Sequence, residues 1–235
     1  GRDYRNYNPY TKIMSVRFEL PQMLAVAGYS AAEIGTALAQ ILGVDASEIF
    51  GALTGELGGT ARFSPADAMS FLMDVMELDL RQMAKVLAQW YPDQPSYVMS
   101  LLLDRYDPDA DELASGLYAA GWTTVGLGER KVGLDMIVYV LANKYRINEP
   151  GDVIAALRRA GVPALDVARE MDIQIEFLAP RARVSATTYA WRQAWLKAFL
   201  QEGYSVADVA GWERRTSGSY YSTVLLLCQL GFSLD

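Results

Sequence analysis

Short stretches of helical periodicity alternate with turn signals along most of the chain. Apolar residues recur three and four positions apart, as at Ile34, Leu38, Ile41 and Leu42. This spacing gathers apolar side chains on one face of an α-helix. We therefore predict helices near residues 20–27, 30–42, 46–57, 65–76, 80–90, 95–105, 110–120, 123–131, 134–145, 150–160, 163–171, 186–202, 206–215 and 219–230.

Many of these helices open with one local pattern: an apolar residue, then Ser or Asp, then an acid or amide three positions later. At the N-cap, Ser or Asp accepts a hydrogen bond from an unpaired amide of the first turn, and the later acid or amide bonds back to the N-cap amide. The preceding apolar residue is expected to pack on the helix, as Tyr29 on Ile34 and Tyr204 on Val209. The close copies pair Ser30 with Glu33, Asp45 with Glu48, Ser64 with Asp67, Asp79 with Gln82, and Ser205 with Asp208; looser copies lie at 108–113, 122–124 and 162–167.

Glycines stand where helices are expected to end, since Gly is favoured just past a helix C-terminus. They are Gly28, Gly43, Gly58, Gly121, Gly161, Gly203 and Gly231. Helix starts in the first half recur roughly every 14–18 residues, so paired helices recur about every 30 residues, which is in the range of stacked helical hairpins. We predict an all-α fold, an α-solenoid or superhelical stack of short hairpins with about 12–14 helices. A continuous repeat domain would cover residues 19–235, more regular over 19–121 and less regular over 122–235, after an extended arm at 1–18.

Two segments leave their structure open. Residues 172–179 alternate Ile173, Ile175 and Phe177, which fits either a short extended piece or a distorted turn among helices. In the longest predicted helix, Trp191, Trp195 and Phe199 recur at four-residue spacing and form one stripe. That stripe fits core packing, or a groove that binds a partner; Trp191 and Trp195 are therefore interaction candidates.

The composition excludes several kinds of chemistry. The 235-residue chain has no His and one Cys, Cys228. No His-based triad, His-ligated zinc, Cys cluster or internal disulfide can form within it. The acid-rich run 104–112 lacks the Gly and Glu that a calcium loop requires, and fits acids gathered at a helix start. We expect no enzymatic activity, no metal and no cofactor, and a buried packing role for Cys228.

Charge is distributed unevenly. The chain holds 21 basic and 28 acidic residues, a net charge of −7, and residues 1–120 alone carry −8. Between Glu19 and Asp79 the only basic residue is Arg62. An acidic balance argues against a nucleic-acid partner, because phosphate binding needs clustered basic residues. The longest apolar stretches, 136–142 and 223–228, are too short to span a bilayer, and a single Cys leaves the compartment open.

Both ends of the chain are candidates for interaction. Residues 1–14 have no helical period and interleave Tyr4, Tyr7 and Tyr10 with Arg2 and Arg5. They fit either a loose tail or an arm that lies on an acidic neighbour. At the other end Phe232 and Ser233 form a helix-start signal with no helix after it. We expect a piece cut from a longer array, or one completed by another copy.

The openings at residues 27–34 and 203–209 resemble those of bacterial α-helical repeat proteins. The first helix of TAL-effector-like DNA-binding repeats also opens with Gly, an aromatic residue, Ser and then an acid. The likeness covers only these openings, since Gly58-Gly59 is the sole pair of adjacent glycines and the base-reading loop has no regular counterpart. The resemblance implies a helical-repeat fold and no particular functional residues.

These observations favour a non-enzymatic structural or interaction protein that self-assembles head to tail into a filament or array, with copies of itself as the partner. Two alternatives remain open: an adaptor that binds another protein or a peptide, and a helical-repeat nucleic-acid-binding protein.

Overall fold

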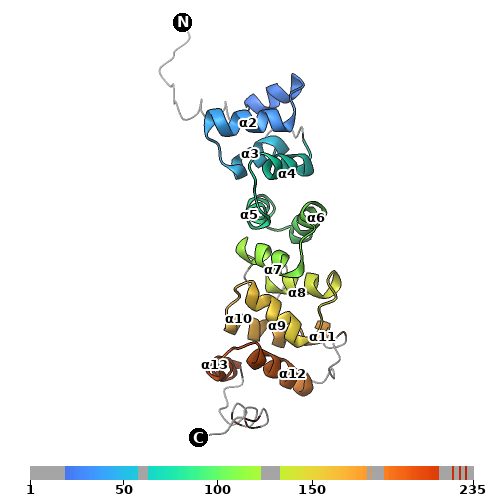
Figure 1. The fold of residues 1–235 in the computed structure, drawn as a ribbon, viewed down its shortest axis with the longest axis vertical. Helices are drawn as coiled ribbons and strands as arrows, with labels where there is room; N and C mark the ends of the chain where they lie inside the picture. Colours follow the sequence, from blue (N-terminus) through green and yellow to red (C-terminus); the bar gives the residue numbers. More distant parts are fainter. Residues whose placement is uncertain are drawn as a thin grey trace. The chain divides into compact units, whose positions relative to one another are not determined.

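In the computed structural model, the described part of the chain comprises residues 19–57, 63–122, 133–178, 181 and 188–216, with 224, 228 and 231. Its elements are all α-helices, which confirms the predicted all-α class. Residues 19–26 are helical and precede the labelled elements. The helices are α2 (Ala31–Leu42), α3 (Ala46–Thr54), α4 (Pro65–Asp74), α5 (Leu80–Trp90), α6 (Pro95–Tyr106), α7 (Ala110–Ala119), α8 (Leu134–Asn143), α9 (Pro150–Arg159), α10 (Ala164–Ile173), α11 (Ile175–Leu178), α12 (Thr188–Gln201) and α13 (Val206–Thr216) (Figure 1).

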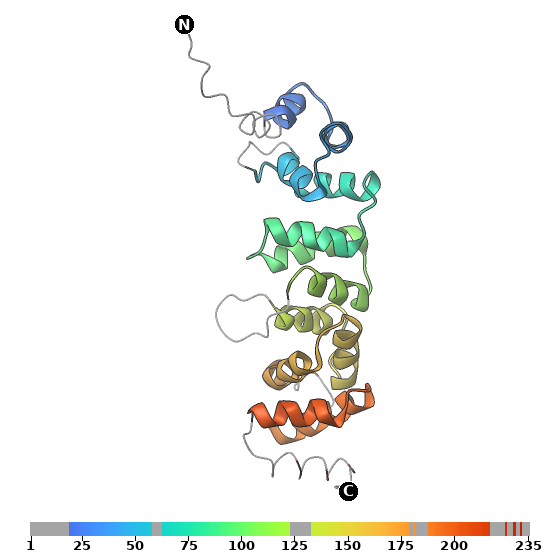
Figure 2. The same cartoon turned by 90° about the vertical axis from the view of Figure 1, so that its left-hand side faces the viewer.

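The chain forms two compact units, Gly1–Asp107 (unit 1) and Pro108–Asp235 (unit 2). Within unit 1, α2 packs on α3 and α4, α3 packs on α4 and α5, and α5 packs on α6. Figures 1 and 2 show α5 and α6 side by side, first nearly end on and then along their length. Within unit 2, α9 contacts α7, α10 and α12, and α10 also contacts α13. Contacts between successive and next-but-one helices are compatible with a helical repeat stack.

A three-residue corner recurs between helices. Its first residue has a positive φ, its second is apolar and its third is the N-cap of the next helix. The corners lie at residues 28–30, 43–45, 77–79, 161–163 and 203–205. In each, the amide of the apolar residue donates to a carbonyl of the preceding helix at 3.0–3.2 Å. This bond satisfies a carbonyl that the helix end leaves without a partner.

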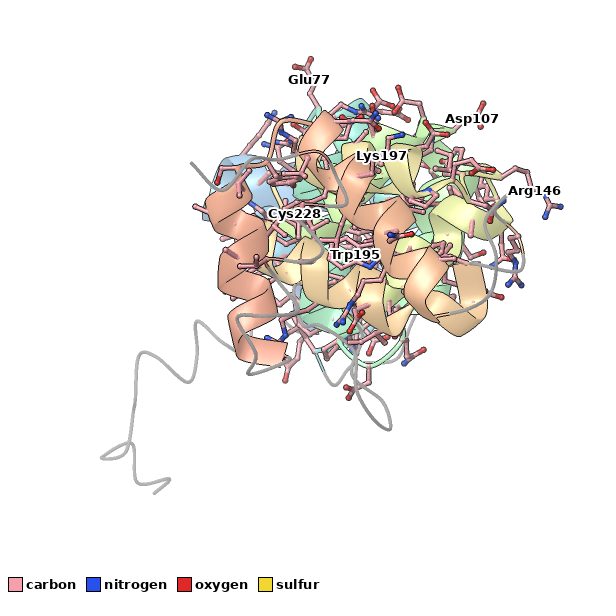
Figure 3. All side chains as sticks on the ribbon, turned by 90° about the horizontal axis from the view of Figure 1, so that it is seen from below. Glu77, Asp107, Arg146, Trp195, Lys197 and Cys228 are labelled. Carbon is pink, nitrogen blue, oxygen red and sulfur yellow. The ribbon has the colours of Figure 1, made fainter. Side chains whose placement is uncertain are left out.

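Glycine is the low-cost residue at the first position of such a corner, because it has no Cβ to clash at positive φ. Gly28 has φ 93° and Gly203 φ 84°. Glu77, with φ 54°, occupies the same position, and Arg146, with φ 60°, follows α8 in a similar way. The side chains of Glu77 and Arg146, which follow α4 and α8, point outward from the surrounding helices (Figure 3). Because these two side chains point outward, they do not crowd their neighbours, but the positive φ still strains the backbone at both residues.

The helix starts carry the capping bonds that the sequence pattern indicates. The Ser30 hydroxyl accepts a bond from the Glu33 amide at 3.3 Å, and the Glu33 carboxylate accepts one from the Ser30 amide at 2.8 Å. Reciprocal pairs also join Ser64 to Asp67, Asp79 to Gln82, Asp109 to Glu112, and Ser205 to Asp208. Asp45 accepts from the Glu48 amide at 2.8 Å.

Two helical glycines set how closely the helices of unit 1 approach. A Cβ at Gly35 would lie 2.6 Å from Cζ and 2.7 Å from Cδ1 of Phe71, inside normal contact distance. A Cβ at Gly51 would lie 2.7 Å from Cη2 of Trp90. Trp90 is held in place because its Nε1 donates to the Ser47 carbonyl at 2.9 Å. These glycines therefore allow α2 to reach α4 and α3 to reach α5 at short range.

Some elements differ from the expected pattern. Helix α3 ends at Thr54 rather than near residue 57, because Gly55 adopts φ 82° there. Residues 175–178 form α11, so the extended alternative for this segment is wrong. The predicted helix at 123–131, most of that at 219–230, and Gly58 lie outside the described residues. Among the described helices, none has the length and apolar character that crossing a membrane requires.

Candidate interaction surface

An open groove of about 380 Å³ lies on unit 1, beside the start of α2. One wall is the first turn of α2 and the other is one face of α4. The groove is lined by Ser30, Ala31, Ala32, Phe63, Asp67, Ser70, Phe71, Asp74 and Val75. The residues from α4 are three and four positions apart and so form one stripe. We call this feature the α2–α4 groove; its volume is within the range of ligand-binding clefts.

The floor of the groove is apolar and fixed. Phe71 is only 3% exposed, and its ring occupies the space that a side chain at Gly35 would fill. Val75, at the end of the same stripe, is 48% exposed. Tyr29, immediately before Ser30, is 49% exposed, and its expected packing on Ile34 stays a prediction. Apolar side chains on this part of unit 1 are thus accessible to a partner.

The rim of the groove is negatively charged. Hydrogen bonds from the Ser64 hydroxyl and amide hold the pKa of Asp67 below its usual value, with a smaller contribution from Arg105. The amide and hydroxyl of Ser30 lower the pKa of Glu33, which follows Ala32 on α2 but does not line the groove, in the same way. Asp74 is exposed and has no hydrogen-bond or ion-pair partner among the described residues. Carboxylates beside an aromatic and apolar floor suit basic and aromatic side chains of a partner.

A second apolar surface lies on the helix at residues 19–26. Met23 is 67% exposed and Val26 is 68% exposed. They are three positions apart and so share one helical face. Other helices of unit 1 bury such a face against a neighbour, as α4 does with Met69 and Leu72. Exposed apolar groups that lie together are typical of protein-binding surfaces.

The interaction candidates predicted from the sequence have different outcomes. Trp191 and Trp195 are 1% and 0% exposed, so they belong to the core of unit 2 and offer no surface to a partner. Trp191 Nε1 donates to the Met171 carbonyl at 2.8 Å, and the Trp195 and Phe199 rings meet edge to face at 6.0 Å. Figure 3 shows Trp195 within the helices. Arg2, Tyr4, Arg5, Tyr7, Tyr10, Phe232 and Ser233 lie outside the described residues.

One further expectation needs correction. Cys228, expected as a buried packing residue, is exposed. Tyr204 stacks on Phe199 with ring centroids 4.0 Å apart, and its expected packing on Val209 stays a prediction. The corner at Gly203 positions this stack, because the Tyr204 amide donates to the Phe199 carbonyl and brings the two rings together.

The acid-rich run at 104–112 has structural roles in the described chain. Asp109 caps α7 together with Glu112. Asp111 pairs with Arg159, whose Nε lies 2.6 Å from Oδ2. No group of three or more potential metal ligands occurs among the described residues.

Unit 2 has an aromatic pair in which one ring is exposed and the other is half-buried. Tyr139, 49% exposed, stacks on Phe177 with ring centroids 5.5 Å apart. The Arg181 guanidinium lies 4.0 Å from the Phe177 ring centroid and donates to the Phe177 carbonyl. Tyr and Arg are enriched at residues that dominate protein interfaces.

Ser30 and Asp67 of the α2–α4 groove were predicted from the sequence as capping residues, but no residue of the groove was predicted as an interaction candidate. Periodicity indicates that Phe71 and Val75 lie on a helix but not which helix lies opposite. The one feature of the sequence that pointed to an acidic surface in this region was the scarcity of basic residues between Glu19 and Asp79. No protein-family model matches the chain, and no curated protein or solved structure was found to match it.

Proposed function

We propose that this chain is a non-enzymatic helical-repeat protein that binds protein, with copies of itself as the partner. The observation that carries the proposal is the accessible apolar surface of unit 1. Met23, Val26, Tyr29 and Val75 are 48–68% exposed, although the helices around them bury their apolar faces. Burial of such a surface is the main driving force of protein association.

Helical packing supports a partner that is itself helical. Met23 and Val26 present an apolar stripe of the kind that helices in this chain pack against one another. A repeat unit buries its faces on neighbouring repeats, so an uncovered face accepts a further helix. A second copy supplies such helices without another protein.

Sedimentation velocity over a wide range of protein concentration tests the proposal. The wild-type chain is expected to shift from monomer to larger species as concentration rises. Met23→Lys with Val26→Lys should weaken this association, because charges on the stripe resist burial. Gln40→Lys with Ser96→Lys is the matched control, since it adds the same charge at exposed polar positions of unit 1. A wild-type chain that stays monomeric at every concentration overturns the proposal.

The aromatic pair of unit 2 favours a second candidate function, an adaptor for another protein. Tyr139, Phe177 and Arg181 supply the accessible ring area and charge that interface anchors use. Tyr139→Ala should then reduce capture of one specific partner from the native source. Equal capture by wild type and variant would count against this role.

A further inference from the structure

We propose that the α2–α4 groove is the receptor for residues 2–5 of a second copy of the chain. This inference rests on the proposed self-association and names the groove and the segment that meet. Its grounds are the apolar floor of the groove, its charge, and the spacing of its carboxylates.

The floor suits an aromatic side chain. Phe63 presents a partly exposed ring, Ala31, Ala32 and Val75 add apolar surface, and the buried Phe71 ring lies beneath them. Aromatic rings pack favourably on one another beyond the gain from buried area. Residues 2–5 supply one ring, Tyr4, two positions after Arg2 and one before Arg5.

The charges are complementary. Asp67 and Asp74 lie along the groove, and Arg62 is the only basic residue between Glu19 and Asp79. Residues 1–14 contain three basic side chains, Arg2, Arg5 and Lys12, against one acid, Asp3. Oppositely charged surfaces steer association and fix the register of the partners.

The spacings agree as well. Asp67 and Asp74 are seven residues apart on one helix, which places them about 10 Å apart along its axis. Three residues in the polyproline II conformation, from Arg2 to Arg5, rise about 9 Å and bring the two arginine side chains to the same side of the segment. Tyr4 falls between the two arginines as Phe71 falls between the two aspartates. A segment in this conformation can therefore place both guanidinium groups at the carboxylates, with the Tyr4 ring a third of a turn away and directed to the floor.

A fluorescently labelled peptide of residues 1–14 tests the groove directly. Titrated with the full chain, it should bind saturably and more weakly as salt increases. Asp74→Lys should weaken binding by about fivefold or more, because it replaces an attraction with a repulsion. Lysine at the end of α4 is compatible with the helix dipole, so folding is preserved. Asp93→Lys is the matched control: it makes the same charge change at an exposed turn that does not line the groove.

Sedimentation of the full chain tests whether the segment comes from a second copy. Arg2→Glu with Arg5→Glu, and separately Asp74→Lys, should each reduce self-association, whereas Asp93→Lys should not. Peptide binding in the groove by a chain that is monomeric at all concentrations would show docking within one chain, and would overturn both the second-copy assignment and the proposed self-association. Self-association that Asp74→Lys leaves intact, with no peptide binding, would overturn this inference alone and leave the proposed function standing on another surface.

Discussion

Gly35→Ala tests whether the close approach of α2 and α4 holds unit 1 together. The new Cβ would lie 2.6 Å from Phe71 Cζ, whereas ordinary contacts begin at 3.4 Å. The ring must therefore move by about 1 Å, and Phe71 is only 3% exposed. Overpacking of this kind costs about 1–3 kcal/mol. Alanine in a helix is more favourable than glycine by about 1 kcal/mol. We therefore expect the free energy of unfolding to fall by about 1 kcal/mol, and by at most about 2 kcal/mol.

Urea unfolding followed by circular dichroism measures this loss as a lower midpoint for unit 1. Gly151→Ala is the control, because its Cβ would meet only Ala198 Cβ at 3.9 Å, an ordinary contact. That variant should be as stable as wild type or slightly more stable. Phe71→Leu removes ring atoms that cause the clash, so its cost should be smaller in the Gly35→Ala background. The proposed clash with Phe71 would be refuted if Gly35→Ala were as stable as wild type and if the effects of Gly35→Ala and Phe71→Leu on the free energy of unfolding were additive.

Three further changes test the helix ends and the titrating groups, each by urea unfolding. Arg146→Gly should raise stability by about 1 kcal/mol, since it removes a side chain from a position with φ 60°; an unchanged or lower midpoint contradicts this. Ser64→Ala should cost about 1 kcal/mol through the lost cap. The lowered pKa of Asp67 gives stability that is present above the ordinary Asp pKa and is lost as the pH falls through the lowered value. Ser64→Ala should therefore also make the free energy of unfolding depend less on pH in the acid range. Burial, helped by the charge of Asp79, raises the pKa of Tyr106 to about 12. Its neutral hydroxyl donates to the Leu78 carbonyl at 2.9 Å. The stability that this neutral hydroxyl contributes is therefore complete below pH 10 and is lost as the pH rises to about 12. Tyr106→Phe should lose less stability than wild type over that alkaline range. Identical dependence of stability on pH in the two proteins would contradict the role given to the Tyr106 hydroxyl.

Helix starts could be predicted from the sequence because the responsible interactions are local. The bonds of Ser30 with Glu33 and of Ser205 with Asp208 connect residues three positions apart. The same holds for the ends at Gly28 and Gly203, where glycine relieves strain at positive φ. Glu77 and Arg146 adopt the same backbone region without glycine, so no residue type marks them in advance.

The α2–α4 groove could not be predicted in this way. It depends on which helix face meets which, and Gly35 and Phe71 are far apart in sequence. Trp191 and Trp195 show the same difficulty, because a stripe at four-residue spacing fits a core and an exposed groove equally well. Only the packing of α12 on α9 and α10 places them inside unit 2. The sequence likewise did not predict the exposure of Cys228, because its neighbours in the sequence are apolar.

The three-residue corners bear on how the chain folds. Each corner closes with bonds between residues that are close in sequence, as from Tyr204 to Phe199 and from Ser205 to Asp208. Little loop-closure entropy is lost when such bonds form. Helices joined by the corners then find their neighbours by short searches, and proteins with mostly local contacts fold fast. A partly folded segment can serve as a template on which the next helix orders, so folding can start at several places and spread along the chain.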